Sequence, residues 1–423
     1  MTIEKIHSRW VVDSRGNPTV EVDVTIRGGY VGRASVPSGV SVAISEAAEL
    51  RDQSRRFGGK GVSKALNIIE HTIAPVVIGM AADNQEELDA RLCSLDGTKD
   101  KSHLGSNTIL GVSMATAKAV ALSRRVPFYR YVAHLAGHNK LELPMPLVNV
   151  LDGGAHAFNS TDIQEFMIIP RSAHDIHSAI RISMEIFHEL GCLLKDKGLA
   201  VSVGDEGGWA PFKISSNNQA LVYIMQAIEK AGYRAGEDVV IALDFAASQL
   251  YKNGRYDLKL DKKQLGARAM MDWYQKLIDD FPIVSLEDPL REEAWGDWQA
   301  LNKRLQNKMQ LVGDDLIATN EHRLLKAIQL RAANTVLIKP NQIGTLTETI
   351  HAAALAKANG WRTIIAGRAG ETEDTSIAHL AVGLKVGQIK AGSVSRGERT
   401  AKYNELLRIC ESLRSEKITS GLF

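Results

Sequence analysis

The chain has 423 residues, of which 44% are hydrophobic and 24% are charged, and this composition is ordinary for a globular protein with a large core. Its 51 basic and 49 acidic residues leave a net charge of +2, which gives no electrostatic reason to expect a nucleic-acid partner. The three cysteines are widely spaced and form no CxxC pair, which argues against a disulfide framework and against structural zinc.

The opening stretch, MTIEKIHSRWVVDSR, lacks the apolar core of a signal peptide. No window of the sequence approaches the ~18 uninterrupted apolar residues of a membrane-spanning helix. Sparse cysteines also fit a reducing compartment. We therefore expect a cytoplasmic protein with no membrane partner.

The first third of the chain predicts a mixed α+β domain. Residues 19–26 (TVEVDVTI) alternate with a period of two, which indicates a half-buried strand, and the turn-forming stretch DSRGNP precedes them. Residues 31–45 are small and polar and favour a loop. Residues 104–122 are rich in small apolar side chains and predict a buried helix.

Two prolines in residues 141–146 (LELPMP) interrupt the pattern, and we place a domain boundary close to them. The expected domains cover residues 1–138 and 139–423. The second domain repeats one theme, in which a short apolar run ends in a polar residue and a helical stretch follows. The runs end at Asp244, Glu287, Asp314, Lys339, Arg368 and Lys390.

This alternation of strands and helices predicts an α/β fold with a parallel sheet covered on both faces. Closing eight such units gives a β/α barrel, whose chemistry lies at the carboxyl ends of the strands. The competing open, doubly wound sheet requires a glycine-rich phosphate turn, and the sequence has no GxGxxG motif. We therefore expect a barrel whose polar strand ends meet in one site.

Asp244, Glu287 and Asp314 end three consecutive strands, and converging carboxylates repel each other unless a cation lies between them. Oxygen ligands without histidine or cysteine favour Mg²⁺. Salt bridges to neighbouring lysines are the alternative interpretation. Lys339 and Lys390 end later strands, where burial and neighbouring cations are expected to lower the pKa of a lysine and make it a general base.

A second group of polar residues lies outside this series. Gln164 and Glu165 precede an apolar run, and Glu206 lies in a glycine-rich turn. A carboxylic acid here could protonate a departing hydroxyl while a lysine removes a proton on the other side, and the result would be β-elimination of water. His156 is flanked by glycines and could reach a ligand, although a lone histidine is more often structural.

At these residues the chain resembles the enolase family over nearly its whole length. The matching stretches are DSRGNPTVEV, SNTILGVSMA, IQEFMIIP, VGDEGGWAP, LDFAAS, SLEDP, VGDDL, LIKPNQIGTLTET, AGETEDT and GQIKAG. The resemblance implies an amino-terminal α+β domain that caps the barrel, reversible dehydration of 2-phosphoglycerate to phosphoenolpyruvate, and a homodimer or higher homo-oligomer. A lysine base paired with Mg²⁺ is a known arrangement of the enolase superfamily.

The resemblance also implies a role for each matching residue. The implied ligands of the tightly held Mg²⁺ are Asp244, Glu287 and Asp314, and Ser41 matches a loop serine that helps to hold a second Mg²⁺. The implied catalytic groups are the base Lys339 and the acid Glu206, with Glu165 beside it. The implied substrate-binding residues are His156, Gln164, Lys390 for the carboxylate and Arg368 for the phosphate.

The departures from the family pattern gather around the expected phosphate site. The family loop SGASTG reads SGVSVA here, with Val42 and Ala43 as its altered residues. The family segment SHRSGE reads AGRAGE, so that Ala366, Gly367 and Ala369 replace a serine, a histidine and a serine around Arg368. Two further changes are Asp152 for asparagine and Gln249 for glutamate.

Three hypotheses follow. The first is an enolase-type dehydratase acting on 2-phosphoglycerate or a close analogue. The second is an enolase paralogue of specialised metabolism acting on another phosphorylated or phosphonylated carboxylic acid, which the altered loops favour. The third is a non-catalytic binding protein on the same fold.

Overall fold

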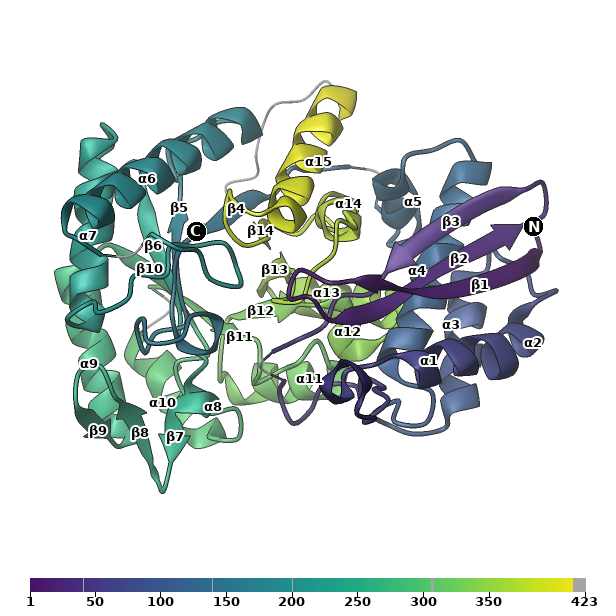
Figure 1. The fold of residues 1–423 in the computed structure, drawn as a ribbon, viewed down its shortest axis with the longest axis horizontal. Helices are drawn as coiled ribbons and strands as arrows, with labels where there is room; N and C mark the ends of the chain where they lie inside the picture. Colours follow the sequence, from purple (N-terminus) through teal and green to yellow (C-terminus); the bar gives the residue numbers. More distant parts are fainter. Residues whose placement is uncertain (41, 139, 200, 306–307, 414–423) are drawn as a thin grey trace.

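The computed structural model describes residues 1–40, 42–138, 140–199, 201–305 and 308–413 (Figure 1). Ser41, an expected ligand of a second Mg²⁺, lies outside the described residues. Figure 1 shows a small antiparallel sheet with its helices on one side of the molecule and a barrel surrounded by helices on the other.

The amino-terminal sheet has the strand order β1-β2-β3, with β1 at Ile3–Val12, β2 at Pro18–Ile26 and β3 at Tyr30–Ser35. The predicted strand over residues 19–26 is therefore confirmed. The loop prediction for residues 31–45 is wrong in its first part, because β3 covers residues 31–35. Gly28 and Gly29 both have positive φ and turn the chain back, so that β3 pairs antiparallel with β2.

Helices cover this sheet and form the rest of the domain. They are η1 (Arg56–Gly59), α1 (Ser63–Ile68), η2 (Ile69–Ile73), α2 (Ala74–Val77), α3 (Gln85–Asp96), α4 (Ser106–Ser123) and α5 (Phe128–Leu135). The helix predicted over residues 104–122 is α4, which is buried along most of its length. A β-carbon at Gly32 would lie only 2.0 Å from the carbonyl oxygen of Ala115, so a glycine here lets α4 approach β3 closely.

The second domain is a closed barrel of eight strands in the order β10-β11-β12-β13-β14-β4-β5-β6. The barrel strands are β4 (Met145–Asp152), β5 (Glu165–Ile169), β6 (Val240–Asp244), β10 (Ile283–Glu287), β11 (Gln310–Gly313), β12 (Thr335–Ile338), β13 (Arg362–Ala366) and β14 (Gln388–Lys390). A small sheet outside the barrel contains β7 (Tyr251–Lys252), β8 (Arg255–Leu258) and β9 (Lys263–Leu265).

Helices surround the barrel (Figure 1). They are η3 (Gly154–His156), α6 (Ile176–Asp196), α7 (Asn217–Lys230), α8 (Ala247–Leu250), α9 (Ala267–Asp280), α10 (Trp295–Leu305), α11 (Glu321–Leu330), α12 (Pro340–Ile343), α13 (Leu346–Ala358), α14 (Ser376–Gly383) and α15 (Gly397–Leu413). The predicted barrel with an α+β cap is confirmed. The domain division at 138/139 stays a prediction, and it falls between the end of α5 and the start of β4.

The expectation of eight parallel units is wrong at one strand, because β5 runs antiparallel to both β4 and β6. The connection from β4 to β5 contains only the short turn η3, and a parallel neighbour needs a longer crossover. The helices α6 and α7 then follow one another before β6. As a result Glu165, at the start of β5, lies between Asp152 and Asp244, which end β4 and β6.

Apolar side chains fill the interior of the barrel below the site. At the opposite end of the barrel, Gln310 at the start of β11 donates a hydrogen bond of 2.7 Å to Gln388 at the start of β14. Both glutamines are buried. The barrel is therefore a packed core, and its polar pocket lies at the carboxyl ends of the strands.

Candidate active site

One buried pocket at the carboxyl ends of the barrel strands collects the predicted site residues. It is lined by Val40, His156, Gln164, Glu165, Glu206, Asp244, Ala246, Asp288, Asp314, Asp315, Lys339, Gly367, Arg368, Ala369 and Lys390. Glu287 does not line the pocket but contacts Lys390 directly. The structure thus brings together every predicted site residue that it describes, and the role of each stays a prediction.

Lys390 is the centre of an ion-pair network on one side of the pocket. Its Nζ lies 2.8 Å and 2.9 Å from the two carboxylate oxygens of Glu287, 3.0 Å from Asp244 Oδ2 and 3.1 Å from Glu165 Oε2. Salt bridges between the strand-end acids and lysines are therefore present. They do not exclude a cation, because each carboxylate has about four lone-pair sites.

Lys339 follows β12 and forms an ion pair with Asp314 Oδ2. Burial by itself lowers the pKa of Lys339, but the Asp314 carboxylate outweighs burial, so the net pKa is raised. Burial by itself also lowers the pKa of Lys390. Asp244, Glu165 and Glu287 outweigh burial, so the net pKa of Lys390 lies well above its usual value. The expectation of lowered lysine pKa values is therefore wrong, because the nearest partners are carboxylates rather than cations.

Two acids that sequence reasoning missed join the predicted metal ligands. One ligand atom each from Glu287, Asp288 and Asp314 lies within 4.8 Å of the others. Burial, and then neighbouring acids, hold the pKa values of Glu287, Asp288 and Asp315 well above their usual ranges. Asp288 and Asp315 each directly follow a predicted ligand, in SLEDP and VGDDL. Their position next to a predicted ligand could have identified them as site residues from the sequence.

These crowded, buried carboxylates fit a hard divalent cation. Burial, and then the neighbouring acids, favour the neutral form of these carboxyl groups, and a cation among them would favour the ionised form. The donors are oxygens, which Mg²⁺ prefers. Asp288 is also structural, because its two oxygens accept hydrogen bonds from the backbone N–H groups of Asp314 at 3.1 Å and Asp315 at 2.8 Å.

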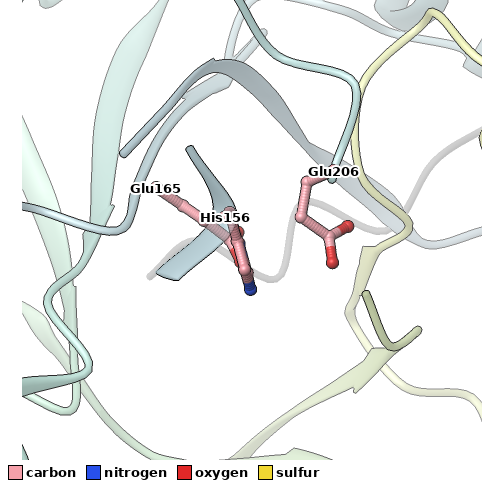
Figure 2. Close-up of side chains that lie close together, drawn as sticks. All are labelled: His156, Glu165 and Glu206. Atoms are coloured by element: carbon pink, nitrogen blue, oxygen red, sulfur yellow. The ribbon is translucent and has the colours of Figure 1, made fainter. Parts of the chain in front are cut away.

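His156, Glu165 and Glu206 form a second group across the pocket (Figure 2). Figure 2 shows the side chains of His156 and Glu206 pointing into the same space. His156 Nδ1 lies 3.3 Å from Glu165 Oε1, and one ligand atom from each of the three residues lies within 4.8 Å of the others. Burial by itself lowers the pKa of His156, but Glu165 and further acids raise it to about 9.

Arg399 on α15 neutralises Glu206 and was missed by sequence reasoning. Its NH1 lies 2.9 Å from Glu206 Oε2, and its side chain is fully buried. Burial by itself raises the pKa of Glu206, but Arg399 and then His156 outweigh burial and lower it. Between these two residues the surroundings therefore favour a proton on His156 over one on Glu206. Arg399 occurs in the charged stretch RGERTAKYNE, which is typical of a solvated helix face and gave no signal.

Asp152, one of the departures, lies beside this group. Its Oδ2 accepts a hydrogen bond of 3.2 Å from the backbone N–H of Glu206, and Asn149 donates to its Oδ1. Burial holds the pKa of Asp152 well above its usual range. Gln249, another departure, donates a hydrogen bond of 3.3 Å to Gln164, which donates one of 3.4 Å to Asp244.

The expected anion site is built around the buried guanidinium of Arg368. Arg368 NH1 lies 2.8 Å from Glu46 Oε2, and its NH2 donates a hydrogen bond of 3.2 Å to Glu46 Oε1. NH1 also donates a hydrogen bond of 3.2 Å to Asn341 Oδ1. Glu46 comes from the cap and follows no strand-end pattern, so sequence reasoning missed it. Reciprocal backbone hydrogen bonds of 2.9 Å between Ser38 and Gly370 fasten the cap segment to this corner.

Comparison with known proteins identifies the fold and its family. Residues 3–132 match the family model described as Enolase, N-terminal domain, and residues 140–422 match Enolase, C-terminal TIM barrel domain. The chain is 50% identical over 411 residues to a protein named Enolase from Natranaerobius thermophilus, which covers 97% of this chain and 95% of that protein. This chain belongs to the enolase family.

Family membership makes the protein an enolase-type hydro-lyase and favours this hypothesis over a non-catalytic binding protein. Among the described residues, no helix is both long and apolar enough to cross a membrane. Of the two altered residues of the enolase loop, Val42 is exposed and Ala43 is buried. The backbone N–H of Ala43 donates a hydrogen bond of 3.1 Å to Glu46 Oε1.

At Gly367, in the altered enolase segment, there is little room for the histidine of the family pattern. A β-carbon on Gly367 would lie 3.1 Å from Glu371 Oε1. Glu371 is held in turn, because Lys402 Nζ lies 2.9 Å from its Oε2 and the backbone N–H of Arg368 donates to its Oε1 at 3.1 Å. A histidine at position 367 would therefore require Glu371 to shift.

Proposed function

We propose that this protein is a Mg²⁺-dependent lyase that removes the proton α to a carboxylate and eliminates water, from 2-phosphoglycerate or a close analogue. The observation that carries this proposal is the division of the pocket into two halves. One half contains two lysines among strand-end carboxylates, and the other contains a histidine and two glutamates. Proton removal on one side and hydroxyl loss on the other require such an arrangement.

The acids Asp244, Glu287 and Asp314 would hold the Mg²⁺. When bound, the ion would stabilise the negative charge that develops on the substrate carboxylate. Lys390, with its raised pKa, stays protonated and binds a substrate carboxylate as a cation. Lys339 is the proposed base, and it can accept a proton only when the charge of Asp314 is neutralised by another cation, because the Asp314 ion pair keeps its pKa high.

On the opposite side, Glu206 and Glu165 are the proposed acid groups. Because the pKa of His156 is raised to about 9 and that of Glu206 is lowered, His156 is the proposed proton store of the free protein, and Glu206 would pass a proton from His156 to the departing hydroxyl. Gln164 orients Asp244 through its side-chain amide. Arg368 would bind the phosphate or phosphonate group through parallel hydrogen bonds.

A second candidate function is favoured by the anion corner. Arg368 is already paired with Glu46, and Ala366, Gly367 and Ala369 supply no side-chain donor to an anion. The paralogue hypothesis, with another phosphorylated or phosphonylated carboxylic acid as substrate, follows from this loss of donors. We also propose that the protein acts in the cytoplasm as a homodimer or higher homo-oligomer without nucleic acid, on the strength of its family.

The deciding experiment incubates the purified protein with Mg²⁺ and 2-phosphoglycerate and follows formation of the enol product by ultraviolet absorbance. The same assay is run with phosphonylated 3-hydroxy acids, which carry the departing hydroxyl β to the carboxylate, and with EDTA. A specificity constant (kcat/KM) for 2-phosphoglycerate of about 10⁶ M⁻¹s⁻¹ or above would identify an ordinary enolase. A higher specificity constant for a phosphonylated acid than for 2-phosphoglycerate would support the paralogue. Turnover that persists in EDTA would contradict the Mg²⁺ dependence.

A further inference from the structure

Gln342 is a buried amide that connects the predicted metal ligand to the predicted base. It lies on α12, which directly follows Lys339. Its Nε2 donates a hydrogen bond of 2.8 Å to Asp314 Oδ1, the oxygen that does not bind Lys339. Its Oε1 accepts a hydrogen bond of 2.8 Å from the hydroxyl of Thr319, which itself accepts one of 2.9 Å from the backbone N–H of Lys339.

The same residue also contacts the cap. The backbone carbonyl of Gln342 accepts a hydrogen bond of 2.8 Å from the N–H of Ala47. Its Nε2 lies 3.5 Å from Glu46 Oε1, within hydrogen-bond reach, and Glu46 holds the guanidinium of Arg368. A single side chain thus lies between the carboxylate expected to bind Mg²⁺ and the cap residue that holds the expected anion-binding arginine.

We propose that Gln342 is a positioning residue that holds Asp314 in the orientation of a metal ligand and fixes the cap segment around Glu46 against the barrel. This inference rests on the proposed function, which gives Asp314 its metal. Hydrogen-bonded partners of metal-binding carboxylates orient the ligand and tune the affinity of the site. With both ends of its amide hydrogen-bonded in a buried setting, Gln342 has one strongly preferred orientation.

The test measures Mg²⁺ binding to the whole protein by calorimetry, so it does not depend on turnover. Gln342→Met keeps the length and apolar stem of the side chain but removes the amide, and we expect Mg²⁺ affinity to fall about tenfold. Gln310→Met is the matched control. Gln310 is an equally buried glutamine at the opposite end of the strand that precedes Asp314, and its loss should leave Mg²⁺ affinity unchanged.

A purely structural role for Gln342 predicts a different result. In that case Gln342→Met and Gln310→Met would both lower the melting temperature and both retain the Mg²⁺ affinity of the unmodified protein, and the proposal would be overturned. If Gln342→Met does not fold, Thr319→Val decides, because it leaves Gln342 in place without the hydroxyl that orients it. A lower Mg²⁺ affinity of Thr319→Val supports the proposal, and an unchanged affinity contradicts it.

The two proposals can fail separately. If the unmodified protein binds Mg²⁺ but dehydrates none of the acids tested, the proposed function fails. The Mg²⁺ affinities of Gln342→Met and Gln310→Met then still test the positioning role of Gln342. If the unmodified protein does not bind Mg²⁺, the ligand set itself is wrong and the positioning role falls with it. If all variants turn over but Gln342→Met needs no more Mg²⁺ than Gln310→Met, only the positioning role fails.

Discussion

Asp314 is shared between two partners, since one carboxylate oxygen binds the ammonium group of Lys339 and the other accepts from Gln342. Asp314→Ala removes one of the three charged ligands proposed for Mg²⁺ and also the partner of the base. We expect abolished activity and a large loss of Mg²⁺ affinity, measured by calorimetry. An unchanged affinity would show that Asp314 is not a ligand.

The division of the pocket into a base side and an acid side predicts separable defects. Lys339→Ala should stop exchange of the α-proton with solvent, because it removes the proposed base. Glu206→Gln should stop dehydration but leave measurable exchange, because the base and the carboxylate cluster are intact. Exchange in deuterated water, followed by nuclear magnetic resonance, tests both, and equal loss in the two variants would argue against separate roles.

At the scale of elements, the end of β13 and the residues after it carry three of the expected departures from the family pattern. Ala366→Ser and Ala369→Ser should restore hydroxyl donors, and each hydrogen bond to a charged group contributes about 1.5–3 kcal/mol. We expect the variant that combines these two serines with Val42→Thr and Ala43→Gly to gain activity on 2-phosphoglycerate. Adding Gly367→His should help less, because its β-carbon meets Glu371 at 3.1 Å. Steady-state kinetics measures each step, and no gain from the serines would argue that the corner does not bind phosphate.

The close approach of α4 to β3 makes a second prediction at this scale. Gly32→Ala should destabilise the protein by about 1–3 kcal/mol, because the added β-carbon would overlap the backbone of α4. The matched control is Gly266→Ala, since a β-carbon there meets nothing within 4 Å and Gly266 has no positive φ. Urea unfolding measures both, and equal stability of the two variants would contradict the packing argument.

At the scale of the whole molecule, Asp374 fastens the barrel to the cap. Its Oδ2 lies 2.7 Å from Lys118 Nζ on α4 and accepts a hydrogen bond of 3.1 Å from the backbone N–H of Ser35 on β3. Burial by itself raises the pKa of Asp374, but Lys118 and hydrogen bonds outweigh it and lower the pKa from 3.8 to about 2. A carboxylate with a lowered pKa stabilises the folded state above its unfolded pKa.

The contribution of Asp374 should therefore be complete above about pH 4 and be lost as the pH falls from 3.8 towards about 2. This shift corresponds to about 2 kcal/mol of stability, which Asp374→Asn should remove at neutral pH. The exposed pair of Arg304 and Asp272 supplies the control, because Asp272→Asn should change stability little. Urea unfolding at several pH values checks this, and a pH-independent difference between Asp374→Asn and the unmodified protein over this range would contradict the assignment.

Much of the site follows from the sequence alone. Six apolar runs ending in polar residues were sufficient to predict a barrel and to name Asp244, Glu287, Asp314, Lys339, Arg368 and Lys390 as neighbours, because the carboxyl ends of barrel strands meet at one face. The period-two alternation of residues 19–26 predicted a strand, and the small apolar residues of 104–122 predicted a helix. Both predictions were possible because the burial pattern of a strand or helix appears in the spacing of residues that are close in sequence.

The tertiary structure decided what depends on contacts between distant residues. The direction of β5, which places Glu165 between Asp152 and Asp244, follows from a connection too short for a crossover rather than from the composition of the strand. Glu46 and Arg399, which hold Arg368 and Glu206, come from segments with no pattern of their own. The raised pKa values of the lysines follow from carboxylates that only folding brings near, because charges interact through space and burial strengthens that interaction.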